Sequence, residues 1–542
     1  MSHNSYIRLL QTKYASVSKL VIAIFCVIAF TSLSLEQKKS SKQKPPNILF
    51  LIADDAGIDF SAYGSSYVNT PAFDRVAKEG ILFNKAYTPN AKCAPSRSCI
   101  LTGRNSWQLE AAANHWIYFP PQFKTFPEVL IENGYESGYT GKGYQPGFAL
   151  THDGKKRDLL IKSYDTFRLQ PPTKEISRID YASNFKYFHQ VTDQDKPWFF
   201  WVGFNEPHRA YEYGTGTSVG RKNVASIKKV PGYLPDTDTV RNDILDYAFE
   251  IEYMDKQVQK ILDYLTASGE LENTIIVYTS DHGMPFPRVK GNQYENSNHI
   301  PMAVMWKNGI KTTGRKVDDY ISFIDLAPTF LQAAGITPTQ SGMHPIAGNS
   351  LFTIFNSNKN GQVETARNFV LVGQERHDIG RPNDWGYPIR GLHKSGMLYL
   401  INYEPDRWPA CNPETGYLNT DGGATKTFIL NQRRSGVEKK FWRLCFGHRV
   451  AVELYDIKKD PDCIMNLAGK QKYKLIEESM KIELLSKLKS EGDYRMFGYG
   501  HIYENFPGAV YNNFYERFMK GESLKFNWIN KSDIEKLPFD DY

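Results

Sequence analysis

The sequence has few cysteines and little net charge over most of its length. Six cysteines in 542 residues are too few for a disulfide framework, and no internal repeat or long low-complexity segment is present. The net charge of +7 is concentrated at the start, where residues 1–44 hold seven Lys and Arg residues and one acidic residue, so that residues 45–542 keep +1. A globally basic nucleic-acid binder is therefore excluded, and any attraction for an anionic substrate has to be local.

Long apolar runs are also lacking. The apolar run from Leu20 to Phe30 follows basic residues that end at Lys19, and small or polar residues come after it. A membrane-spanning helix needs about 20 apolar residues, so this pattern predicts a signal peptide over residues 1–35, with an uncleaved anchor as the alternative. We expect export to the periplasm or the medium, no stable membrane insertion after signal removal, and a flexible leader over residues 36–46.

The length predicts more than one structural unit. A chain of 542 residues with 41% hydrophobic residues is globular and too long for a single small core. After about Pro382 the sequence pattern changes to short segments of alternating apolar and polar residues among Gly, Pro and Asn. Apolar residues at helical spacing return over Tyr473–Leu488. We predict a large catalytic domain over residues 47–385 and a smaller α+β subdomain over residues 386–542 that ends in an aromatic-rich tail.

Three short apolar runs indicate buried strands of a parallel sheet, at residues 47–52, 198–203 and 274–279. Residues 243–267 have the apolar spacing of a helix, which Gly269 closes. The fold class is thus α/β. Each run ends in polar residues, which are Asp54 and Asp55, Asn205 to His208, and Asp281 and His282. Open α/β sheets bind ligands at the carboxyl ends of their strands, so these residues predict a site.

A further motif combines a cysteine with a helix start. Cys93-Ala-Pro-Ser-Arg97 has Pro95 in the first turn of a predicted helix, where free N–H groups favour anions. Arg97 lies four residues after Cys93, on the same face, and can hold an oxyanion. By itself this motif leaves three alternatives for Cys93: a helix-start residue, half of a disulfide with Cys99, or a thiolate nucleophile.

The ordered set of motifs resembles the formylglycine-dependent (type I) sulfatase family of the alkaline-phosphatase-like superfamily. The motifs share the family's order and are Asp54-Asp55-x-Gly57, Cys93 to Arg97 with Leu101-Thr-Gly-Arg104, Gly141-Lys142, Ser280 to Gly283, Ser322 to Thr329, Glu453 to Pro461, and Asn466 to Ala468. Residues 204–209 and 281–287 look closest to the heparan N-sulfatase (sulfamidase)-like branch. The resemblance implies a large mixed, mostly parallel sheet flanked by helices.

The resemblance also implies a chemistry for individual residues. A maturing enzyme would oxidise Cys93 to formylglycine (3-oxoalanine), and one Ca²⁺ per chain would be held by Asp54, Asp55, residue 93, Asp281 and His282, although Asn is commoner than His at position 282. The sulfate oxygens would be held by Arg97, Lys142 and Lys290, and His208 would protonate the leaving group. Tyr144 stands where many members have a histidine, so Tyr144, His115 or another residue takes that part.

The resemblance implies a sulfated carbohydrate as substrate, a polysaccharide or its oligosaccharides, with an O- or N-linked sulfate. Candidate sugar contacts are residues near the site or in the polar run before the subdomain boundary: His115, Trp116, His299, Glu375, Arg376, His377, Asp378 and Arg381. Three alternatives remain open. They are a phosphate or phosphonate ester hydrolase of the same superfamily, a non-catalytic glycan-binding protein, and a hydrolase that uses Cys93 as a thiolate.

Overall fold

The computed structural model describes residues 44–536. The predicted signal peptide and nearly all of the leader lie outside these residues. A compact unit begins at Pro46 and contains every helix and strand that follows. Within residues 44–536 no helix combines the length and the apolarity that a membrane span requires.

A seven-stranded sheet forms the centre of this unit, in the order β11-β2-β10-β8-β1-β7-β5. Its strands are β11 (Arg315–Val317), β2 (Ile81–Phe83), β10 (Met302–Met305), β8 (Thr274–Ser280), β1 (Asn47–Ala53), β7 (Trp198–Gly203) and β5 (Glu136–Gly141). Strand β1 pairs in parallel with β7 and β8, β5 is parallel to β7, and β10 is antiparallel to β8 and β2. The predicted α/β fold with a mixed, mostly parallel sheet is confirmed.

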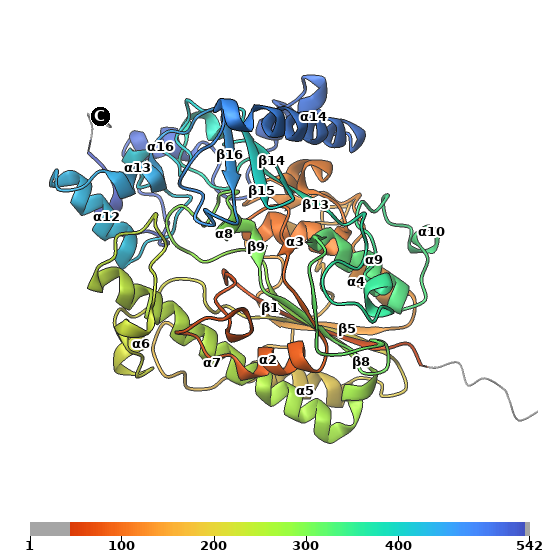
Figure 1. Cartoon of the computed structure of the whole chain (residues 1–542). Helices are drawn as coiled ribbons and strands as arrows, with labels where there is room; N and C mark the ends of the chain where they lie inside the picture. The colour runs from red at the N-terminus through yellow and green to blue at the C-terminus, as the bar shows by residue number, and fades with distance from the viewer. Residues whose placement is uncertain (1–43, 537–542) are drawn as a thin grey trace, which may run out of the picture. The chain divides into compact units, whose positions relative to one another are not determined.

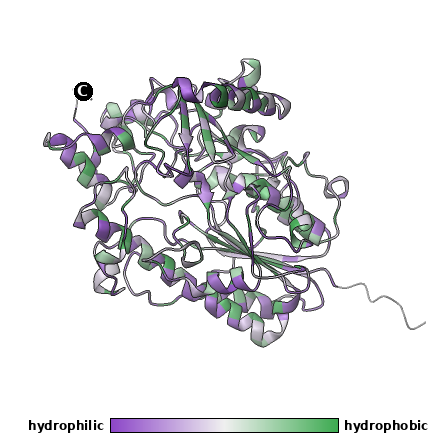
Figure 2. Cartoon of the chain, viewed as in Figure 1, coloured by the Kyte–Doolittle hydropathy of each residue, from purple (hydrophilic) through white to green (hydrophobic). Residues whose placement is uncertain are grey.

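Helices cover both faces of this sheet (Figure 1). Helices α2 (Pro71–Lys78), α5 (Tyr181–Val191) and α7 (Asp238–Ser268) lie on one face, and α3 (Cys93–Thr102), α4 (Phe126–Glu132) and α9 (Leu326–Ala333) on the other. Successive side chains of β1 enter opposite layers, since Leu49 packs on the α7 side and Phe50 on the α3 side. Burial on both faces explains why β1 is a continuous apolar run, and Figure 2 shows the overlapping strands of the central sheet largely in green.

Helix α7 forms the longest covering element. It begins five residues before the predicted range, where Thr237 caps it by accepting a hydrogen bond from Val240 N–H. It ends at Gly269, whose φ of 77° lies in the left-handed region that favours glycine. The buried residues of α7 include the acidic side chains Asp243, Asp246, Glu250 and Asp255 as well as apolar ones.

A second, antiparallel sheet has the order β13-β14-β15-β16. Its strands are β13 (Phe369–Gln374), β14 (Ile389–Lys394), β15 (Met397–Asn402) and β16 (Val452–Asp456), and α14 (Lys474–Ser490) packs on it through Leu484 and Leu488. Strand β13 precedes the predicted subdomain boundary at residues 385–386 but pairs with β14 beyond it. The boundary itself stays a prediction.

The other elements are short. One small sheet contains β3 (Ala86–Tyr87), β9 (His299–Ile300) and β12 (Ile321–Ser322), and another pairs β4 (Tyr118–Phe119) with β6 (Phe148–Ala149). The remaining α-helices are α6 (Thr215–Ser218), α8 (Glu295–Asn298), α10 (Pro338–Ser341), α11 (Phe352–Phe355), α12 (Ala424–Arg434), α13 (Lys440–Phe446), α15 (Ile502–Asn505) and α16 (Phe514–Met519).

Candidate active site

The carboxyl ends of β1 and β8 bring three predicted site residues together. The parallel register pairs Ala53 with Ser280, so the next residues, Asp54 and Asp281, lie side by side. Asp281 N–H donates to Ala53 O at 3.1 Å, and Asp281 Oδ1 accepts from Asp55 N–H at 3.1 Å. The backbone of one strand end thereby fixes the carboxylate of the other.

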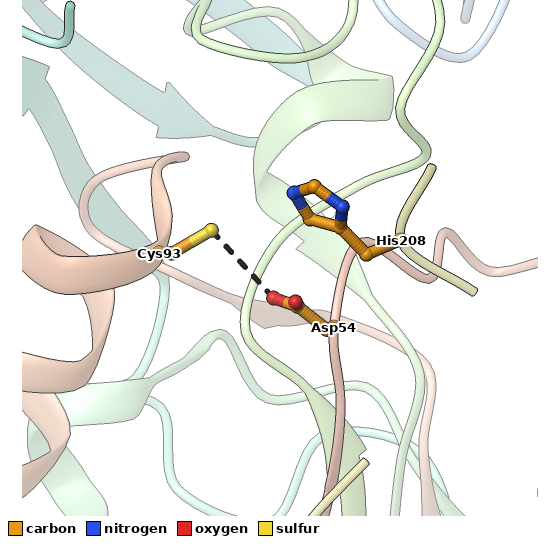
Figure 3. A group of neighbouring side chains, drawn as sticks. All are labelled: Asp54, Cys93 and His208. Carbon is orange, nitrogen blue, oxygen red and sulfur yellow. Dashed lines mark hydrogen bonds between the residues drawn. The ribbon is translucent and has the colours of Figure 1, made fainter. Parts of the chain in front are cut away.

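Cys93 approaches this point from the first residue of α3. Its Sγ lies 3.6 Å from Asp54 Oδ1, 4.0 Å from Asp55 Oδ1 and 3.4 Å from His282 Nε2. Figure 3 shows the Cys93 side chain directed at the Asp54 carboxylate, with the His208 ring beside them. We call Asp54, Asp55, Cys93, Asp281 and His282 the strand-end cluster, and all five are buried. The five cysteines among the described residues are free, so no disulfide joins Cys93 to Cys99.

The strand-end cluster has the donors that a hard cation requires. One ligand atom each from Asp54, Asp55 and Asp281 lie within 4.8 Å of one another, and so do those of Asp55, Cys93 and His282. Calcium binds several oxygen ligands, and carboxylates supply them. The donor set therefore fits a divalent cation, with an imidazole as one unusual member.

The charge states suit a cation as well. Burial opposes ionisation of Asp281, but the charges of His282 and Arg97 outweigh it and hold the pKa of Asp281 below its usual range. Burial likewise opposes ionisation of Asp55, and the Lys290 ammonium most strongly keeps its pKa low. His282 Nδ1 lies 3.1 Å from Gly283 O, to which it can donate, and Nε2 faces the cluster, where it would have to be deprotonated to bind a cation.

Arg97 lies beneath the cluster and is fully buried. Its Nε and Nη2 donate to Asp281 Oδ2 at 3.0 and 2.9 Å, and its Nη1 donates to the carbonyl oxygens of Lys142 and Gly143, both at 2.8 Å. Its Nη2 also lies 3.4 Å from Asp54 Oδ1, so four backbone or side-chain groups hold the guanidinium in one orientation. It joins the helix α3 to the loop after β5, where Lys142 lies.

Two lysines add positive charge at the cluster. Lys142 Nζ lies 2.7 and 2.5 Å from the two carboxylate oxygens of Asp54, and Lys290 Nζ lies 2.6 Å from Asp55 Oδ2. Lys290 also donates to His208 Nε2 at 2.9 Å. The arrangement offers positive groups on several sides of Cys93, which is what a tetrahedral oxyanion needs.

Asp421 belongs to this arrangement and was not predicted. Its Oδ2 accepts a hydrogen bond from Lys290 Nζ and lies 3.8 Å from His208 Nε2. It comes from the loop before α12, more than 100 residues after the last predicted catalytic residue. Only the Asp421-Gly422-Gly423 turn sequence marks it, and that sequence is typical of many loops.

A pocket of about 460 Å³ opens above Cys93. Of the predicted residues, Asp54, Cys93, His115, Lys142, His208 and Lys290 line it. Further residues line the pocket, among them Lys92 and Arg209. We call six of these further side chains the pocket wall; they are Glu175, Glu206, Glu250, Asp378, Asp421 and Trp528. They come from positions spread over more than 350 residues of sequence. Glu206 belongs to the polar residues after β7 and Asp378 to the polar run before the subdomain boundary, whereas no specific motif marks the other four.

Of the other predicted sugar contacts, Trp116 and Asp378 line this pocket, whereas Arg376 and Arg381 do not. Arg376 donates to Phe506 O at 2.9 Å, and Arg381 donates to the carbonyl oxygens of Trp408 and Pro409 at 2.8 and 2.7 Å. These two side chains are engaged with the backbone of the C-terminal loops. Their role in sugar binding stays a prediction without support from these contacts.

The two remaining histidines and Tyr144 are also engaged elsewhere. His299 Nδ1 lies 2.9 Å from Glu295 Oε1, and His377 lies between Gly291 O and the Asn90 side chain. The Tyr144 hydroxyl contacts Ser98 Oγ at 3.1 Å, and burial raises the pKa of Tyr144. Of the candidates for the part of the missing histidine, His115 lines the pocket and Tyr144 does not.

The family profile described as Sulfatase matches residues 46–336, and the chain belongs to this family. It is an enzyme, a sulfuric ester hydrolase, of a family that generally uses formylglycine and a metal ion. The predicted family resemblance is confirmed.

The chain is similar to N-sulphoglucosamine sulphohydrolase of Homo sapiens, at 26% identity over 82% of this chain and 90% of that protein. It is also 26% identical to an ulvan-active sulfatase of Formosa agariphila, over 89% of this chain and 81% of the relative. A structure described as BT4656 in complex with its substrate D-glucosamine-2-N,6-O-disulfate matches with a TM-score of 0.58 at 20% identity, covering 83% of this chain and 99% of that one. At that identity the structural match supports the fold alone.

Proposed function

We propose that this enzyme hydrolyses the sulfate ester or N-sulfate of a sulfated carbohydrate, with Cys93 converted to formylglycine by a maturing enzyme and one Ca²⁺ in the strand-end cluster. The convergence of three carboxylates, one imidazole and Cys93 within a few ångströms carries this proposal. Two relatives whose names specify a sulfated sugar or polysaccharide support the substrate class.

Asp54, Asp55, Asp281, His282 and residue 93 would hold the cation. When bound, it supplies positive charge that lowers the pKa of a neighbouring hydroxyl and polarises sulfate oxygens. Hydrated formylglycine offers two hydroxyls, one to attack sulfur and one to lose its proton as sulfate leaves, which a thiol cannot do. The proposal thus requires oxidation of residue 93 as well as a cation beside it.

Three basic side chains of the site have distinct tasks in this proposal. Lys142 and Lys290 bind sulfate oxygens directly, since both line the pocket beside Cys93. Arg97 is fully buried and holds Asp281 and the Lys142 backbone, so it fixes the positions of its neighbours and adds charge from below. Their summed charge stabilises the transferring sulfuryl group.

His208 would donate a proton to the departing oxygen or nitrogen. Its Nδ1 contacts Arg209 O and its Nε2 receives a hydrogen bond from Lys290 Nζ, so Nε2 is the atom that faces the reaction. The protonated His208 would give up its Nε2 proton and regain one from water after each turnover, while Lys290 keeps its charge and Asp421, 3.8 Å from Nε2, stabilises the imidazolium. His115 is the proposed sugar contact on the same pocket.

The test begins with mass spectrometry of the Cys93 peptide, because conversion of the thiol to the aldehyde lowers the mass by about 18 Da. Sulfate release from sulfated sugars is then measured for the wild type and for Cys93→Ala, which we expect to lower activity at least about 1000-fold. Unchanged turnover in Cys93→Ala would contradict the proposal. Release of sulfate and of phosphate from matched aryl esters is compared, and faster release of phosphate would indicate a phosphate ester hydrolase. If the aldehyde form binds sulfated sugars but does not hydrolyse them, the protein is a glycan-binding protein.

We also propose that the enzyme acts in the periplasm or outside the cell, as the basic and apolar pattern of residues 1–35 predicts. Fractionation of cells that express the full chain tests this, together with N-terminal sequencing of the mature protein. An N-terminus that still includes residues 1–19 would contradict signal removal.

A further inference from the structure

The buried stripe of α7 presents one carboxyl group to the pocket without a partner. Glu250 is 4% exposed and lines the pocket, yet it makes no hydrogen bond or ion pair with any residue of the described range 44–536. Buried polar groups are as a rule hydrogen-bonded, because an unsatisfied one is costly. A buried carboxyl that faces a ligand pocket in this state points to a partner on the ligand.

The neighbouring acidic residues of α7 differ from Glu250 in this respect. Asp243 binds the Arg209 guanidinium through both oxygens at 2.8 Å, and Asp246 accepts from Gly214 N–H and Gly216 N–H at 2.8 and 2.7 Å. Asp255 accepts from two backbone N–H groups of α2. These three carboxylates stabilise the packing of α7, whereas Glu250 has no such role.

The groups around Glu250 leave it free to act on a ligand. Arg209 is committed to Asp243 and donates its Nε to Pro285 O at 2.8 Å. Glu206, also on the pocket, is held by Ser177 N–H at 3.0 Å and the Tyr181 hydroxyl at 2.8 Å. Burial, reinforced by the charge of Glu206, raises the pKa of Glu250 well above its usual range. The described groups near Glu250 thus offer it no donor.

From this geometry we infer that Glu250 binds a hydroxyl or amino group of the substrate sugar and excludes a carboxylate or second sulfate at that position. The inference rests on the proposed function, since the sugar enters this pocket only if its sulfate binds beside Cys93. The pocket has the volume of a small-ligand site, and Cys93 and Glu250 line the same space. A donor would satisfy Glu250, whereas an anion buried beside Glu206 and Glu250 would find no free cationic partner, because Arg209 is paired with Asp243.

The substrate class that follows is a sulfated hexose or hexosamine, and the excluded class is a sulfated uronate. A uronate carboxylate at Glu250 would find the charge of Arg209 already paired with Asp243 and its Nε bonded to Pro285 O. The strand-end cluster and its lysines attract any sulfate. Discrimination between sugars therefore depends on the pocket wall.

The experiment compares sulfate release by the aldehyde-containing wild type from a sulfated glucosamine and a sulfated uronate monosaccharide. We expect kcat/KM to favour the glucosamine at least about tenfold, the value of one good hydrogen bond. Glu250→Leu should raise KM for the glucosamine about tenfold with little change in kcat. Glu250→Gln keeps an acceptor and gains a donor, so KM should stay within about threefold while the preference over the uronate falls about tenfold.

The matched control is Asp263→Asn on the same helix, whose side chain is 63% exposed. Neither KM nor the preference should change in this variant. If Glu250→Leu does not fold, the Glu250→Gln comparison decides. Equal turnover of the two sugars by the wild type, or an unchanged preference in Glu250→Gln, overturns this inference alone. Absence of sulfate release from every sugar contradicts the proposed function and this inference with it.

Discussion

The strand-end cluster and the pocket wall are built in different ways. The cluster residues follow β1 and β8 directly or begin α3, and their charges are balanced by Arg97, Lys142 and Lys290 at short distances. The pocket-wall residues come from loops and helices between Glu175 and Trp528. The chemistry thus depends on a few short motifs that the sheet aligns, and selectivity depends on residues that only the complete fold brings together.

This difference predicts the largest effect in the cluster. Asp281→Asn leaves the buried Arg97 with a weakened partner and removes one proposed cation ligand. We expect sulfate release to fall about 1000-fold and the free energy of unfolding to fall by about 3 kcal/mol, since breaking a buried ion pair is costly. Sulfate release is measured by a discontinuous assay, and the free energy of unfolding is measured by urea denaturation.

The exposed Asp193→Asn serves as the control for Asp281→Asn and should change neither quantity. A stable, active Asp281→Asn protein would mean that the cluster is not the catalytic centre. The assignment of the chemistry to the strand-end cluster and of selectivity to the pocket wall would then be wrong.

The two regions should also respond to pH in opposite senses. In the pocket wall, burial raises the pKa of Glu206 to about 7, above its unfolded value of 4.5. The stability that this group contributes is complete below about pH 4.5 and is lost as the pH rises through about 7. In the cluster, the lowered pKa of Asp281 means stability that is lost only as the pH falls below 3.8.

Glu206→Gln tests the pocket-wall half of this contrast. The variant should flatten the loss of unfolding free energy between pH 5 and pH 7.5, a change of about 3 kcal/mol in the wild type by the size of the shift. Denaturant titrations at several pH values provide the measurement. A slope unchanged from the wild type would show that Glu206 titrates normally.

Asp421 connects the two regions and should have an intermediate effect. Asp421→Asn removes the charge that faces Lys290 and His208, while it keeps the shape of the side chain. We expect kcat to fall about tenfold to 100-fold with KM little changed, because the proton donor loses its charge partner. Asp421→Glu should recover part of the loss. A change confined to KM would assign Asp421 to sugar binding.

The sequence predicted the parts of the fold that depend on local patterns. Strands β1, β7 and β8 are buried on both faces, so each is a continuous apolar run, and α7 and α14 have the spacing of one-sided helices. The three-residue strands β2 and β11 carry no such pattern, and their pairing joins residues more than 200 positions apart. Strands this short, with partners this far away in the sequence, cannot be predicted from local patterns.

The same limit applies to the site. The residues after β1 and β8 could be predicted because a strand end and a polar pair are adjacent in sequence. Glu250 lies inside a helix whose other buried acidic residues have structural partners, so nothing local distinguishes it from Asp246. Arg376 and Arg381 show the reverse case, because a polar run before the subdomain boundary proved to be engaged with loop carbonyls.

The smallest effect should come from the aromatic part of the pocket wall. Trp528 stacks on Trp116 with ring centroids 5.5 Å apart and donates its indole N–H to Leu418 O at 3.0 Å, so the C-terminal segment holds it rigidly on the pocket. A sugar ring packed on this indole gains about 0.5–1.5 kcal/mol, and Trp528→Ala should therefore raise KM about threefold to tenfold without lowering kcat. Trp528→Phe should recover most of the affinity, and Trp385→Ala, a 39% exposed tryptophan that does not line the pocket, should change nothing. Steady-state kinetics of the three variants on one sulfated sugar gives kcat and KM for each.

A fall in kcat of Trp528→Ala instead of a rise in KM would mean that the C-terminal segment positions the catalytic groups. The pocket wall would then contribute to the chemistry as well as to selectivity.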